Sequence, residues 1–171
     1  MGEECRAIEA LFRSLSASQL DLPVFGEGQG WRVRDIPAHL ALWQWVATRV
    51  AEKVSERGQL PDTPDWDIWA GIETPTDELN DENFRDWRDR PVEDALGRLA
   101  YVHAEMIRAV ERLTPEQIAS GTALPDELQP FLRAPGVRHI RAHRKQIESA
   151  LGGTEILREG GSATSRPSGV T

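Results

Sequence analysis

The chain has 171 residues and a formal net charge of −8, and its sequence pI is about 5.1. This length is typical of one domain, which can bury a core without disulfides, and the single Cys5 cannot form an internal one. The acidic charge argues against a nucleic-acid-binding protein, because such proteins need a basic face. The sequence lacks an apolar run of about 18 residues and the pattern of a signal peptide. We therefore expect a cytoplasmic protein that binds neither membranes nor nucleic acid.

Two helices are predicted in the first third of the chain. Residues 3–16 carry apolar side chains at helical spacing, and residues 17–29 read as a connector containing Pro23 and glycines. Residues 33–57 form a long second helix, which we expect to begin near Arg34 or Asp35, because Pro37 is tolerated only close to a helix start. Gly58 would end this helix.

Two further long helices follow a connection over residues 59–90, in which Leu79–Arg88 is predicted as a short helix. Residues 91–113 have a regular apolar stripe, and Thr114 begins a short turn of helix. A connector over 120–134 leads to the last helix, at about 135–151, which Gly152 and Gly153 would stop. The sequence thus predicts an all-α four-helix bundle with long crossover connections over residues 1–153, and a flexible C-terminal tail over 154–171.

Three histidines are candidate metal ligands. His139 and His143 are four residues apart, so both rings project from one face of the last helix, and His39 interrupts the apolar stripe of the second helix. Three neutral imidazoles would bind one divalent ion and leave a coordination position open, which is typical of a catalytic site. The alternative is a solvated pair together with a hydrogen-bonded core histidine. Imidazole ligands do not fix the metal, and we expect zinc or nickel.

Several other side chains can be interpreted either as ordinary structural residues or as functional ones. His103 lies on an apolar stripe, and we interpret it as a core histidine bonded to a neighbour rather than as a fourth ligand. Cys5 reads as an incidental cysteine of a mobile terminus, although a helix start favours thiolate. Trp43 is interpreted as a core residue, whereas Trp66 and Trp69 form either an apolar wall or lid or a satellite core under the long connection. The candidates to orient the imidazoles are Asp65, Asp67, Asn80 and Asn83, with a solvated acidic loop as the alternative for the aspartates. Arg138 and Arg141 are candidates to meet an anionic thiol, and the alternative for them and for Arg144 is to cover the helix surface or pair with acidic neighbours.

Three segments together resemble a known family. The segment GWRVRDIPAHLALWQW (residues 30–45) resembles the second-helix signature of the DinB-like superfamily, and VRHIRAHRKQIESAL (137–151) resembles its last-helix signature, HxxxH with a following Gln. The intervening NDENFRDWRDRPVEDALGRLAYVHAEMIRAVERLTPEQI resembles the branch that includes the ClbS/DfsB proteins. The resemblance covers residues 5–151, and Arg32 departs from it, because relatives often carry Ser or Thr as a cap there.

The resemblance implies a four-helix bundle whose metal is held by His39, His139 and His143, in a homodimer that acts on a small molecule. Relatives include thiol-dependent S-transferases, a thiol-dependent isomerase and self-resistance proteins. We therefore expect a metal-dependent thiol S-transferase or a hydrolase of a small electrophile, the former with a low-molecular-weight thiol as cosubstrate. The alternative is a non-catalytic binding or self-resistance protein of the ClbS/DfsB kind, which needs no metal.

Overall fold

The computed structural model describes residues 2–24, 30–59, 66–119 and 136–160, and these are almost entirely helical. Within them the chain forms no strand, only one isolated bridge between Pro23 and Arg32. None of these helices is long and apolar enough to cross a membrane. The elements in chain order are α1 (Glu3–Ser14), α2 (Ala17–Leu20), the 3-10 helix η1 (Val33–Asp35), α3 (Ile36–Arg57), α4 (Trp66–Trp69), α5 (Thr76–Trp87), α6 (Val92–Val110), α7 (Pro115–Ala119) and α9 (Val137–Gly160).

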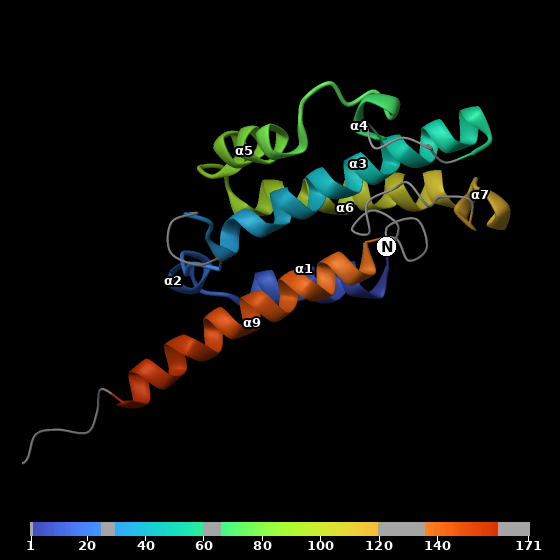
Figure 1. The fold of residues 1–171 in the computed structure, drawn as a ribbon. Helices are drawn as coiled ribbons and strands as arrows, with labels where there is room; N and C mark the ends of the chain where they lie inside the picture. Colours follow the sequence, from blue (N-terminus) through green and yellow to red (C-terminus); the bar gives the residue numbers. More distant parts are fainter. Residues whose placement is uncertain (1, 25–29, 60–65, 120–135, 161–171) are drawn as a thin grey trace, which may run out of the picture.

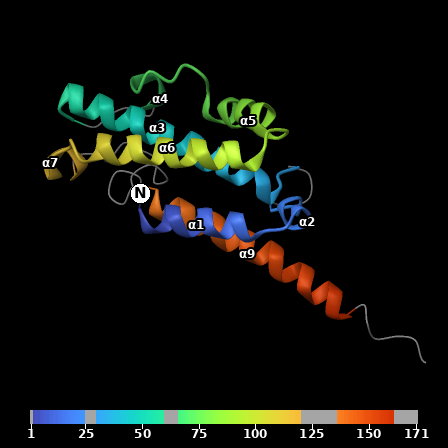
Figure 2. The ribbon, with the colours of Figure 1, turned by 180° about the vertical axis from the view of Figure 1, so that it is seen from behind.

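Four helices pack as two pairs (Figures 1 and 2). Helices α3 and α6 lie side by side, α1 packs against α9, and α5 lies along the outer side of α3. Contacts of α1 with α6 and of α3 with α9 join the pairs. This arrangement confirms the predicted all-α bundle.

The start of α3 is fixed by residues close to it in sequence. Pro37 occupies the first turn, where its missing N–H removes no helical hydrogen bond. The Asp35 carboxylate accepts the backbone N–H of Arg32 at 2.8 Å, and the Arg32 guanidinium donates to the Arg88 carbonyl at 2.7 Å. Asp35 therefore supplies the cap that Arg32 itself lacks, and Arg32 ties the start of α3 to the end of α5. At the other end Gly58 adopts φ +82°, the left-handed conformation that terminates α3 as predicted.

Several helix boundaries differ from the predictions. The expected stop at Gly152 and Gly153 is wrong, since α9 continues to Gly160. Glycine costs about 1 kcal/mol inside a helix but does not prevent one. Helices α2 and α4 were not predicted, and α5 begins at Thr76 instead of Leu79. The proposed domain boundary at residue 153 stays a prediction, because residues 161–171 lie outside the described part of the chain, as does the connector over 120–134.

Two apolar clusters form the core, and His39 lies at their junction. One cluster joins α1 and α9 to the first halves of α3 and α6, and it includes Ile36 and Leu40 on either side of His39. The other joins the second halves of α3 and α6 to Ala70 and Ile72, and Trp43 packs against it. The histidine is thus held in place by apolar packing on both sides.

Candidate metal centre

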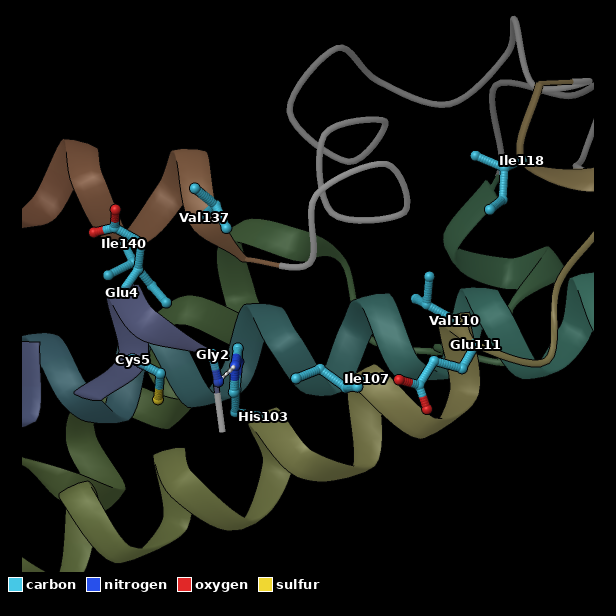
Figure 3. A pocket seen from close by; sticks show the side chains of 10 residues that line it. All are labelled: Gly2, Glu4, Cys5, His103, Ile107, Val110, Glu111, Ile118, Val137 and Ile140. Atoms are coloured by element: carbon cyan, nitrogen blue, oxygen red, sulfur yellow. Dashed lines mark hydrogen bonds between the residues drawn. The ribbon is translucent and has the colours of Figure 1, made fainter. Parts of the chain in front are cut away.

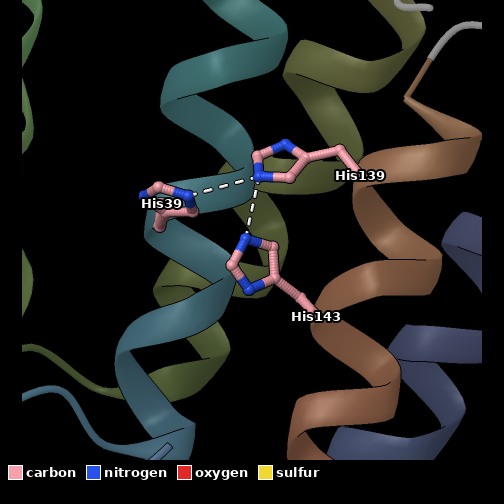
Figure 4. A group of neighbouring side chains, drawn as sticks. All are labelled: His39, His139 and His143. Atoms are coloured by element: carbon pink, nitrogen blue, oxygen red, sulfur yellow. Dashed lines mark hydrogen bonds between the residues drawn. The ribbon is translucent and has the colours of Figure 1, made fainter. Parts of the chain in front are cut away.

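Two helices bring His39, His139 and His143 together (Figure 4). His39 projects from the first turns of α3, and His139 and His143 project from neighbouring turns of α9 toward it. The spacing of four residues on α9 stacks the two rings on one face of the helix. The structure therefore brings together all three of the predicted ligands.

The three rings face one another through their Nε2 atoms. The Nε2 atom of His139 lies 3.3 Å from Nε2 of His39 and 2.8 Å from Nε2 of His143. One donor nitrogen from each ring falls within 4.8 Å of the other two. Among the described residues this cluster contains three imidazoles and no carboxylate or thiol.

Burial keeps all three imidazoles neutral. Loss of solvation lowers the pKa of His39 to about 3 and that of His143 to about 4, and it places the pKa of His139 well below its usual value. For His39 and His139, repulsion by the neighbouring imidazoles lowers the pKa further. A metal ion binds the neutral form of histidine, so the rings need no deprotonation at neutral pH.

The separation of the His39 and His139 donors fits a tetrahedral ion. A zinc–nitrogen distance of about 2.0–2.1 Å places two tetrahedral ligands about 3.3 Å apart. The separation of the His39 and His139 nitrogens is 3.3 Å. The 2.8 Å between His139 and His143 is shorter, so these two atoms need to move apart by about 0.5 Å to hold an ion.

Aromatic rings enclose the histidines. Trp31 meets the His39 ring edge-on, with centroids 5.2 Å apart, and Phe84 stacks on Trp31 at 4.8 Å. Trp43 lies 6.3 Å from the rings of both His39 and His139. Trp43 is partly buried and packs against the core, as predicted. These rings give the site an apolar surround.

Two amide side chains interact with rings of the cluster. The Asn80 side chain of α5 raises the pKa of His39, and the Gln146 side chain of α9 raises that of His143, in each case against the larger effect of burial. Asn80 was a predicted orienting residue. Gln146 was not, although its position three residues after His143 places it next to that ring on the helix.

Of the other predicted orienting residues, Asn83 and Asp67 have hydrogen-bond partners outside the histidine cluster. Asn83 is buried and accepts a hydrogen bond from Arg98 at 2.9 Å. The Asp67 carboxylate accepts the N–H of Ile68 beside it. Asp65 lies outside the described residues, and so do the side chains of Trp66 and Trp69.

His103 is separate from the cluster and is a hydrogen-bonded core residue, as predicted (Figure 3). Its side chain is 2% exposed. Its Nδ1 atom lies 3.0 Å from Oε1 of Gln44, and its Nε2 atom accepts the backbone N–H of Gly2 at 3.2 Å. Since Gln44 Oε1 only accepts, Nδ1 carries the proton and Nε2 the lone pair.

Cys5 corrects the expectation of an incidental residue at a mobile terminus. Its side chain is 2% exposed, in the core cluster of α1 and α9. Together with His103 and apolar residues such as Ile107, it lines a cavity of about 410 Å³ (Figure 3). Burial, reinforced by Glu9, raises its pKa to about 11. The helix start does not activate this thiol, because loss of solvation is the stronger effect.

Two of the arginines near the histidine pair are engaged by carboxylates. Arg141 binds Glu4 of α1 at 2.7 Å, and Arg144 binds Glu148 at 2.8 Å. Arg138 is exposed. For Arg141 and Arg144 the structure has the surface pairing that was one of the two predicted roles.

A comparison with family models identifies the class of protein that this bundle and histidine cluster define. The model of the DinB superfamily matches residues 3–147. The chain therefore belongs to the DinB superfamily. No curated protein and no solved structure is significantly similar to it. Membership of the ClbS/DfsB branch stays a prediction.

Proposed function

We propose that this chain binds one divalent metal ion through His39, His139 and His143, and that it is a metal-dependent enzyme acting on a small electrophilic molecule. The observation that carries the proposal is the convergence of three neutral Nε2 atoms from two helices, separated by 3.3 and 2.8 Å at His139. Three protein ligands leave a fourth position for a thiol or water. Zinc and nickel both suit imidazole ligands.

The ion would supply the nucleophile, because a bound water or thiol loses its proton near neutral pH. The chain's own residues would do the rest. The three imidazoles stay neutral at pH 7, and Trp31 and Trp43 limit the water around them. A low local dielectric of this kind strengthens electrostatic interactions with a polarised substrate.

The thiol of a transferase reaction would come from outside the chain. Cys5 is the single cysteine, its high pKa makes it a poor nucleophile, and it lines the cavity of His103, whose lining includes none of the three clustered histidines. The two reactions that remain under this proposal are transfer of a small thiol to an electrophile and hydrolysis. We also propose that the protein is a homodimer, as the resemblance implies, which analytical ultracentrifugation tests directly.

Elemental mass spectrometry of the purified chain tests the proposal. We expect about one zinc or nickel ion per chain, and close to none in His139→Ala. His103→Ala is the matched control, because it removes a buried imidazole from the same bundle outside the cluster. A wild-type chain that holds no metal and takes up neither added zinc nor added nickel would contradict the enzyme proposal. That result would favour a non-catalytic protein that binds its ligand against the aromatic rings.

If metal is present, a screen of small thiols with model electrophiles distinguishes the two reactions. A transferase consumes electrophile only when both the thiol and the metal are supplied. A hydrolase needs the metal and no thiol. Product formation that continues undiminished in the metal-free His139→Ala variant would contradict both.

A further inference from the structure

The outer nitrogens of the clustered histidines lie next to amide groups that lack a complete set of partners. Nδ1 of His39 and Oδ1 of Asn80 are both buried, and neither makes a hydrogen bond of normal geometry within the part of the chain described. Helix α5, which carries Asn80, packs against α3, which carries His39, and the two side chains interact. Buried polar atoms are rarely left without partners, so a buried ring nitrogen and a buried amide oxygen of two interacting side chains are expected to pair.

The same arrangement recurs at the other end of the cluster. Oε1 of Gln146 is buried without a hydrogen bond of normal geometry. Gln146 lies three residues after His143 on α9, within one helical turn, and the two side chains interact. Asn80 comes from α5 and Gln146 from α9, so two independent parts of the fold supply the same chemical group to two of the three rings.

We propose that Asn80 and Gln146 are positioning residues, which accept the Nδ1–H of His39 and His143 and thereby hold the Nε2 lone pairs of these rings toward the centre of the cluster. The inference rests on the proposed metal site. An imidazole that donates from one nitrogen presents a lone pair at the other, and such outer partners orient metal-binding histidines in general. Neither amide would touch the metal.

The short contacts at His139 agree with this assignment. If His39 and His143 both present lone pairs at Nε2, the proton shared across the contacts of 3.3 and 2.8 Å must sit on Nε2 of His139. His139 is the one ring that faces both others at hydrogen-bonding distance. With an ion bound at Nε2, His139 would carry its proton on Nδ1 instead, and the other two rings would keep their tautomers.

Nitrogen-15 NMR of the imidazoles in the full-length, metal-free chain tests the tautomers directly. We expect His39 and His143 to be protonated at Nδ1, and His139 to be protonated at Nε2. Protonation of His39 at Nε2 would overturn the proposal. This measurement involves no metal, so its outcome is independent of whether the chain binds one.

Metal affinity supplies the second test, by competition between the chain and a chelator for zinc. Asn80→Leu and Gln146→Leu remove the acceptor and should each weaken zinc binding by about 10–100-fold. Asn80→Asp and Gln146→Glu keep an acceptor and should bind at least as tightly as wild type. The conservative variants also keep the test valid should a leucine variant fail to fold.

Asn83→Leu is the matched control for α5. Asn83 is also a buried amide of this helix, but it accepts from Arg98, so its replacement should leave zinc affinity unchanged. Leucine variants of Asn80 and Gln146 that bind zinc as tightly as wild type would overturn the positioning role while leaving the metal site intact. A wild-type chain that binds no zinc contradicts the proposed function instead, and the NMR result then decides the tautomers alone.

Discussion

The bundle holds two kinds of buried histidine. His103 and His39 both have a lowered pKa, and burial is the main cause in each case. The ring of His103 is matched by one acceptor, Gln44, and one backbone donor, Gly2, so both of its nitrogens are bonded. The inner nitrogen of His39 faces another imidazole at 3.3 Å. Burial and a low pKa therefore do not by themselves indicate a metal ligand. What separates the two is the partner of the Nε2 atom, which is a backbone N–H at His103 and another imidazole at His39.

Replacing one histidine of each kind should give the largest effects. His39→Ala should weaken zinc binding by at least about 100-fold, because changes to outer residues alone cost about 10–100-fold. His103→Leu should leave zinc affinity unchanged but lower the free energy of unfolding by about 2–4 kcal/mol, since it strands the buried Gln44 carbonyl and the Gly2 N–H. Chelator competition and urea unfolding measure the two quantities.

The distinction between His39 and His103 is contradicted if the two variants show each other's effects on zinc affinity and stability. Loss of zinc in His103→Leu at unchanged fold would make His103 part of the metal site. Equal destabilisation of the metal-free chain by His39→Ala and His103→Leu would mean that the cluster has the same structural role as His103.

The next largest effect is expected in the pH dependence of the free energy of unfolding, to which the clustered histidines should contribute. In the unfolded chain each histidine has a pKa of about 6.5, whereas folding lowers it to about 3 for His39 and about 4 for His143. As the pH falls below 6.5 the unfolded chain gains protons that the folded chain does not. The free energy of unfolding of the metal-free chain should therefore decrease toward pH 4, with a limiting slope of about 1.4 kcal/mol per pH unit for each neutral histidine.

Urea unfolding in the presence of a chelator, repeated between pH 7 and pH 4.5, measures that slope. His143→Gln should reduce it by about the share of one histidine, whereas carboxylates titrate equally in both chains. An identical slope in wild type and His143→Gln would show that this ring is not held neutral by the fold.

Gly136 offers a smaller change on the His103 side. This residue precedes α9 with φ +70°, and an added Cβ would lie 3.0 Å from Nε2 of Gln44 and 3.4 Å from the Met106 methyl group. Gly136→Ala should cost about 1–3 kcal/mol of stability through backbone strain and this contact. Thermal unfolding measures it, with Gly97→Ala as the control, since nothing lies within 4 Å of a Cβ there. Equal stability of Gly136→Ala and wild type would show that the Gln44 contact adapts freely.

The candidate ligands could be predicted because their signal is local. His139 and His143 share a helix face by spacing alone, and His39 breaks an apolar stripe. The partners of His103 could not be predicted in the same way, because Gln44 is 59 residues away and Gly2 is 101. Asn80 and Gln146 show the same contrast. Gln146 lies within reach of His143 along the helix, whereas the approach of Asn80 to His39 depends on how α5 packs on α3.

The fold itself was predictable where periodicity is long and caps are clear. Helix α3 ends at Gly58 because nothing opposes the left-handed turn there. At Gly152 the same residue type does not end α9, so a glycine pair alone is a weak stop signal. The short helices α2 and α4 escaped prediction because four residues carry too little periodicity.

The smallest effect is expected for replacement of Cys5. This residue lines the same cavity as His103 and is not the proposed nucleophile. Its pKa of about 11 leaves little thiolate at pH 8, so reaction with a disulfide reagent such as DTNB should be at least about 100-fold slower in the native chain than in urea. Cys5→Ala should accordingly keep zinc binding and any thiol-dependent activity, at a cost of about 1 kcal/mol in stability. A rapid native reaction, or loss of activity at full zinc occupancy in Cys5→Ala, would place the nucleophile on the His103 side of the bundle. Slow reaction with retained activity would instead exclude Cys5 as the nucleophile, in agreement with the proposed use of an external thiol or water at the histidine cluster.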